Sequence, residues 1–104
     1  MNIVRTTPYS RRAAKLLSPS EAVTIEDKIA SDPQAWPVIQ GTGGVRKARG
    51  ARGSSGKSGG VRVIYYVQVS ADTLYFLSIY AKNEQENLTD EQKRKLREFV
   101  AALG

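Results

Sequence analysis

The sequence contains no cysteine and no histidine among its 104 residues. The absence of cysteine excludes disulfides, cysteine-based zinc sites and thiol nucleophiles. The absence of histidine removes the commonest metal ligand and the side chain that most often acts as a general base near neutral pH. Any catalysis must therefore use lysine, arginine, tyrosine, carboxylates or backbone groups, and we expect neither a metal nor a cofactor.

Long hydrophobic runs are also missing. No apolar stretch approaches the roughly 20 residues that cross a bilayer, and the start of the chain, MNIVRTTPYSRR, lacks the apolar segment of a signal peptide. A chain of 104 residues leaves room for one small domain with a thin margin for a core. We therefore expect a single cytoplasmic domain over residues 1–104, with no membrane partner.

Acidic residues are absent between Asp32 and Asp72. The net charge is +6, and this acid-free stretch supplies the excess because the segments on either side are nearly neutral. Its cations are Arg46, Lys47, Arg49, Arg52, Lys57 and Arg62. A uniformly basic solvated surface is the alternative, but the clustering favours a face that binds a polyanion. Nucleic acid is a better candidate than a membrane, because the stretch is rich in glycine and is not an amphipathic helix.

Hydrophobic periodicity and capping signals predict an α+β domain. The expected elements are a short strand at 3–4, helices at 8–17 and 18–32, a strand at about 45–49, hairpin strands at 61–69 and 73–81, and a helix at 89–104. This order predicts an antiparallel sheet of about four strands, with the two N-terminal helices packed on one face and a C-terminal helix following.

The stretch from Gly53 to Ser58 resembles the end of a phosphate-binding P-loop. The required first glycine is replaced by Ala51, and a strand follows where a P-loop opens a helix. We therefore expect no nucleotide hydrolysis here. A flexible loop that contacts phosphate and a plain hairpin loop both remain open.

Side-chain alternation along the hairpin strands separates apolar from polar residues. The odd-numbered residues of 61–69 share one apolar face, so Arg62 points to the other. In the next strand the odd-numbered residues of 77–81 form the apolar row, which leaves Tyr80 and Lys82 on the opposite side. If both apolar rows face the helices, Arg62, Tyr80 and Lys82 converge on an open face of the sheet.

The strand at 45–49 can add to this face, although its pattern leaves the orientation ambiguous. Lys47 and Arg49 share one side, and Arg46 takes the other. The alternative is that these are scattered, solvated cations and that Tyr80 is an ordinary strand aromatic.

Cleavage of RNA without a metal requires the 2′-OH to be deprotonated, the phosphorus dianion to be stabilised and the leaving 5′-oxygen to be protonated. Arginine suits the middle task because its planar fork donates two hydrogen bonds and stays charged, and Arg62 is the candidate. Like-charge repulsion favours a neutral lysine among arginines, so lysine can act as base or, when charged, as acid. Candidates are Lys47, Lys57 and Lys82, with Tyr80 as an alternative proton carrier or a stacking platform.

Three blocks of sequence together resemble the HigB branch of the RelE/ParE toxin superfamily. They are GTGGVRKAR, GKSGGVRVIYY and YAKNEQENLT, the last before the terminal helix, and the similarity in order and spacing spans essentially the whole chain. The resemblance implies a ribosome-dependent endoribonuclease that cuts mRNA, and a cognate antitoxin that is HigA-like with a helix-turn-helix.

By position, the resemblance matches Arg62 to an active-site arginine and Lys82 to the terminal lysine of such toxins. It matches Lys47 and Arg49 to their basic strand, and we expect RNA contacts from Arg46, Lys47, Arg49, Arg52 and Lys57. Two other functions compete with the nuclease. One is a ParE-like toxin that inhibits DNA gyrase without cleaving RNA, and the other is a plain RNA-binding module.

Overall fold

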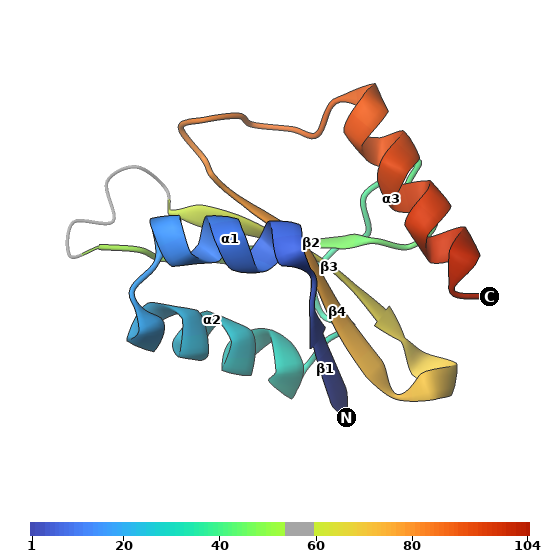
Figure 1. Ribbon diagram of the computed structural model, residues 1–104, viewed down its shortest axis with the longest axis horizontal. Helices are drawn as coiled ribbons and strands as arrows, with labels where there is room; N and C mark the ends of the chain where they lie inside the picture. Colours follow the sequence, from blue (N-terminus) through green and yellow to red (C-terminus); the bar gives the residue numbers. More distant parts are fainter. Residues whose placement is uncertain (54–59) are drawn as a thin grey trace.

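The protein forms a four-stranded sheet flanked by three α-helices (Figure 1). The structure is a computed structural model and describes residues 1–53 and 60–104. Along the chain lie β1 (Asn2–Arg5), α1 (Thr7–Leu16), α2 (Pro19–Ser31), β2 (Arg46–Gly50), β3 (Val61–Gln68), the 3-10 turn η1 (Val69–Ala71), β4 (Thr73–Ala81) and α3 (Asp90–Ala102). The predicted α+β class is confirmed, including the four strands and the C-terminal helix.

The strand order across the sheet is β1-β4-β3-β2. The pairs β2–β3 and β3–β4 are antiparallel, as expected, but β1 pairs with β4 in parallel. Alternation within a strand predicts a hairpin with its sequence neighbour. Alternation carries no information about the direction of a partner strand some 70 residues away, so it does not predict the parallel pairing of β1 with β4.

Helices α2 and α3 begin where their capping boxes predicted. The hydroxyl of Ser18 accepts the Glu21 N–H at 3.2 Å, and the Glu21 carboxylate accepts the Ser18 N–H at 2.8 Å. Thr89 and Gln92 make the same reciprocal pair at the start of α3. Each box satisfies two backbone donors that a helix start would otherwise leave unpaired.

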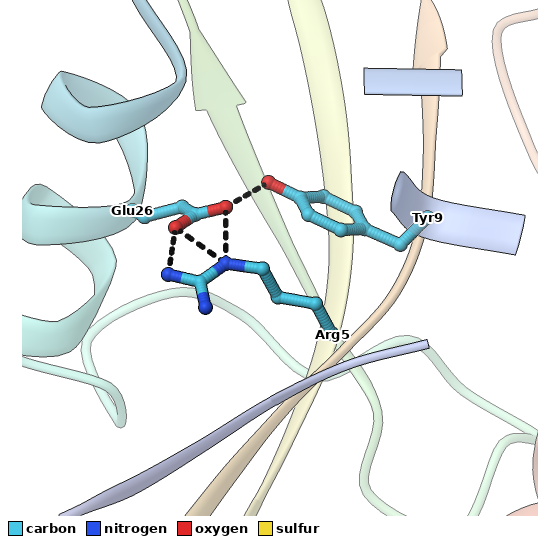
Figure 2. Close-up of polar contacts among 3 residues, drawn as sticks. All are labelled: Arg5, Tyr9 and Glu26. Carbon is cyan, nitrogen blue, oxygen red and sulfur yellow. Dashed lines mark hydrogen bonds and ion pairs between the residues drawn. The ribbon is translucent and has the colours of Figure 1, made fainter. Parts of the chain in front are cut away.

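Helices α1 and α2 lie together on one face of the sheet and enclose the larger core (Figure 1). Tyr9 and Phe76 stack in this core with ring centroids 5.1 Å apart. The Glu26 carboxylate accepts hydrogen bonds from Arg5 Nη2 at 2.7 Å and from the Tyr9 hydroxyl at 2.8 Å (Figure 2). Burial, followed by the hydrogen bond to Glu26, raises the pKa of Tyr9. This cluster joins β1, α1 and α2.

The opposite face of the sheet is partly covered, which corrects the expectation of an open face. Val45, Ile64 and Leu77 are buried there beneath the apolar side of α3, including Leu96 and Phe99. An amphipathic helix buries its apolar side against another apolar surface, and this face of the sheet is the surface that α3 packs on. The edge strand β1 is exposed along its length, and Arg49 near the end of β2 is exposed as well.

A register shift in β4 also breaks the expected apolar row. Ile64 pairs with Ser78 and the next residue, Tyr65, pairs with Phe76, so Leu77 is an extra residue on β4. Leu77 therefore packs beneath α3, whereas Ile79 packs in the core beneath α1 and α2. Bulges of this kind move side chains between faces without a change in the local sequence pattern.

Among the residues that the structure describes, no helix combines the length and apolar character that crossing a membrane requires.

Candidate functional site

A row of three neighbouring positions crosses the sheet at its accessible end. Arg62 of β3 lies directly opposite Arg49 of β2 on one side and opposite Tyr80 of β4 on the other. Directly paired residues project from the same face of a sheet. The Arg62 side chain is only 8% exposed, and its Nη1 donates to the Val61 carbonyl at 3.2 Å. The row therefore holds a largely buried arginine between an exposed arginine and a buried tyrosine.

Lys47 and Lys82 join this row from neighbouring positions. Lys47 is two residues from Arg49 on β2 and so shares its face. Lys82 follows the end of β4, and its N–H donates to the Gly60 carbonyl at 3.1 Å.

Gly60 itself lies close against β2. It has a φ of +71°, and a side-chain carbon there would collide with the Gly50 carbonyl oxygen. A glycine is thus needed just before β3, at the residue whose carbonyl accepts the Lys82 N–H.

The four cations line one pocket of about 370 Å³, together with Glu86 and Asn87 from the segment after β4. Four positive side chains face one carboxylate, so the pocket carries an excess of positive charge. Because arginine and lysine both donate to phosphate oxygens, it suits an anionic ligand such as a phosphodiester. The predicted gathering of Lys47, Arg49, Arg62 and Lys82 is what the structure shows.

Tyr80 supports this pocket without lining it. Its side chain is 3% exposed and belongs to the core beneath α3. Its hydroxyl donates to the Glu86 carbonyl at 3.4 Å, and burial raises its pKa while the charge of Arg62 opposes that shift. A ring so deeply buried has no face for a base to stack on, which corrects the expected stacking platform. A role in proton transfer stays a prediction.

The remaining expected RNA contacts lie elsewhere. Arg46 projects to the opposite side of β2, where its Nη1 donates to the carbonyls of Gln34 at 3.0 Å and Trp36 at 2.6 Å. Arg52 lies beyond β2. Hydrogen bonds are the main cause of the lowered pKa of Glu21 and of Glu84, and the charge of Arg52 lowers both slightly further. Lys57 falls outside the described residues. The structure therefore places Arg46 and Arg52 outside the lining of the pocket.

Sequence reasoning missed Glu86 and Asn87. Both lie in the irregular segment between β4 and α3, where no periodicity predicts which way a side chain points. The signal available was their position in the YAKNEQENLT block, beside the predicted Lys82.

Within residues 1–53 and 60–104, no three acidic side chains gather in a group that could hold a metal ion. The described lining of the pocket brings four cations together with one carboxylate, that of Glu86.

Comparison with known proteins agrees with this architecture. The family model "RelE toxin of RelE / RelB toxin-antitoxin system" matches residues 39–103, a region that contains β2, β3, β4, α3 and every pocket residue named above. Among solved structures, a double mutant of the E. coli toxin RelE in the free state superimposes with a TM-score of 0.62 at 16% sequence identity. That match covers 90% of this chain and 94% of the other. The structural likeness shows a shared fold, the family match spans more than half of the chain, and the protein thus belongs to the RelE family of toxin–antitoxin toxins.

Proposed function

We propose that this chain is a ribosome-dependent mRNA endonuclease that holds the scissile phosphate in the pocket of Lys47, Arg49, Arg62 and Lys82. The observation that carries the proposal is the convergence of these four cations, from β2, β3 and the end of β4, on one pocket. Membership of the RelE family supports a toxin that inhibits translation. The GTGG, GKSGG and Y-x-K-N-E blocks further favour the HigB branch.

In the proposed reaction the 2′-oxygen attacks the adjacent phosphorus. The bond from phosphorus to the 5′-oxygen breaks, leaving a 2′,3′-cyclic phosphate upstream and a 5′-OH downstream. Arg62 is assigned to the phosphorus dianion, because it lies at the centre of the row and is the least exposed of the four cations. Lys47 and Lys82 line the same pocket and are the candidates for taking the 2′-OH proton and supplying the proton to the 5′-oxygen.

Dependence on the ribosome follows from the modest acid–base groups. The described pocket has no histidine, and a lysine must lose its proton before it can act as a base. Positioning of the reacting groups can lower a barrier by about 7 to 11 kcal/mol, so a ribosome that aligns the mRNA supplies what these side chains lack.

The proposed setting follows from the substrate. Ribosomes place the activity in the cytoplasm, and membership of this toxin family pairs the chain with an antitoxin. We propose a HigA-like antitoxin with a helix-turn-helix, which either covers the pocket cations or docks on α1 and α2 so that the complex no longer fits the ribosome. Charge reversal at Lys47 and Arg49 should weaken antitoxin binding only in the first mode.

Translation of a defined mRNA in vitro, with and without ribosomes, tests the function. Cut mRNA with a 2′,3′-cyclic end, seen only with ribosomes, supports the proposal. A substrate with a 2′-deoxy nucleotide at the cut position should resist. DNA breaks that depend on gyrase would identify a ParE-like toxin instead, and RNA binding without damage would leave the plain binding module.

A further inference from the structure

One wall of the pocket is an irregular segment that needs external support. Lys82, Glu86 and Asn87 lie after the last residue of β4 and before α3, outside any helix or strand. A lysine that handles a proton must stay within hydrogen-bond reach of the reacting oxygen. Contacts that fix the position of this segment therefore also fix the position of Lys82 in the pocket.

Glu84 closes the turn that contains Lys82. Its N–H donates to the Ala81 carbonyl at 3.0 Å, and its carboxylate Oε1 accepts the Ala81 N–H at 2.9 Å. The two bonds link the same pair of residues from both directions, with Lys82 and Asn83 between them. The hydrogen bond from the Ala81 N–H contributes most to lowering the pKa of Glu84, and the hydrogen bond from Arg12 contributes next.

Arg12 connects the turn to α1. Its Nη2 donates to the same Glu84 Oε1 at 2.7 Å, and its Nε donates to the Ile79 carbonyl at 2.7 Å. β1 ends at Arg5, which pairs with Phe76, so β4 continues past the end of its parallel neighbour. The Arg12 guanidinium thus donates to the Ile79 carbonyl, in the part of β4 that has no β1 partner, and also to Glu84 in the turn.

We propose that Arg12 and Glu84 are positioning residues, which hold Lys82 at the pocket from the side of the sheet that carries α1. Both side chains are nearly half exposed, at 44% and 46%, and an exposed ion pair by itself contributes little to stability. What sets this pair apart is that each member also bonds the backbone of β4, at Ile79 and Ala81, on the N-terminal side of Lys82. The inference rests on the proposed function for its catalytic consequence, although the positioning itself is measurable without substrate.

The first test uses single-turnover cleavage on programmed ribosomes in a double-mutant cycle. Glu84→Ala should slow cleavage by about tenfold to a hundredfold, the scale of a misplaced catalytic group. If Glu84 acts through Lys82, Glu84→Ala in a Lys82→Ala background should cost almost nothing more. Glu84→Gln keeps an oxygen for the Ala81 N–H and should recover most of the rate.

The matched control is Glu98→Ala, which removes one of the two acidic partners of Arg94 on the exposed side of α3. It should leave cleavage unchanged. Losses that add up in the double variant, or an equal loss in the Glu98 control, would overturn the proposal.

The second test needs no RNA. In the full chain, NMR signals of the Lys82 side chain and hydrogen exchange at the Ala81 amide should change in Arg12→Ala and in Glu84→Ala. They should not change in Arg11→Ala, an exposed arginine one position earlier on α1. Unchanged Lys82 signals would refute the positioning role. Changed signals in a protein that cuts no mRNA would refute the proposed function and leave the positioning intact.

Discussion

Arg62 and Tyr80 occupy directly opposed positions on β3 and β4, and of the two only Arg62 is among the described residues that line the pocket. The arginine reaches the pocket surface, whereas the tyrosine is buried beneath α3 and donates to the Glu86 carbonyl on the pocket wall. One residue of the pair thus lines the pocket, and the other bonds the segment that forms its wall.

Tyr80→Phe separates a supporting role from proton transfer. The change removes the hydroxyl and its bond to the Glu86 carbonyl but keeps the buried ring. We expect cleavage to fall by less than about tenfold, because a lost general acid or base costs about a hundredfold to ten-thousandfold. Single-turnover rates measure the difference, and a loss in that larger range would return Tyr80 to the catalytic set.

Arg62→Ala should lower cleavage by about a hundredfold or more, since loss of a preorganised donor to the transition state costs about 3 kcal/mol. Arg62→Lys keeps the charge but not the planar fork, so only part of the rate should return. Cleavage on programmed ribosomes and thermal melting check the pair of variants. If the Arg62→Ala protein has the melting temperature of the wild type and also cleaves at the wild-type rate, Arg62 does not belong to the site.

Arg46 and Arg49 form a matched comparison within β2. Arg46→Ala removes two hydrogen bonds to the carbonyls of Gln34 and Trp36 and should destabilise the fold by about 1 to 3 kcal/mol, with little effect on RNA affinity. Arg49→Ala should show the opposite, because this exposed side chain lines the pocket. Urea unfolding and RNA titration measure the two quantities. Equal losses of RNA affinity would contradict the separation of the two faces.

Binding of single-stranded RNA should weaken steeply as salt rises. If each of the four pocket cations neutralises one phosphate, the log–log slope is about −2.8, at roughly 0.7 per contact. Arg49→Ala should make the slope less steep by about 0.7, whereas Arg11→Ala on α1 should leave it unchanged. A titration from low to high salt that shows a flat response would exclude a polyanion in the pocket.

Glu21 should make stability depend on acidic pH. Its carboxylate accepts N–H groups from Ser18 at 2.8 Å and from Gly53 at 2.6 Å, and these bonds lower its pKa. Because the folded-state pKa is depressed, the stabilisation is fully present above the usual glutamate value. It is lost as the pH falls through the depressed one. Unfolding curves at neutral and acidic pH measure the free energy of unfolding, which should fall less on acidification in Glu21→Gln than in the wild type. An identical fall in both proteins would mean that protonation of Glu21 is not linked to folding.

The elements that the sequence predicted are those that local patterns encode. A capping box such as Ser18 with Glu21 satisfies its own donors within four residues, so it forms wherever a helix can follow. The hairpin and the outward direction of Arg62 follow from alternation over a few residues. These local rules predicted that Arg62 and Lys82 share one face of the sheet. They left the orientation of Lys47 open, and the structure places Lys47 in the same pocket.

Tertiary structure decided the rest, because the deciding contacts join residues far apart in the chain. The parallel pairing of β1 with β4, the shift that turns Leu77 under α3 and the burial of Tyr80 all depend on which surfaces meet. Glu86 lines the pocket from the segment after β4, where no local pattern sets the direction of a side chain. Alternation turns Arg46 to the other face, but only the folded chain brings the Gln34 and Trp36 carbonyls within its reach. Local patterns describe what a residue prefers, and packing determines what it finally touches.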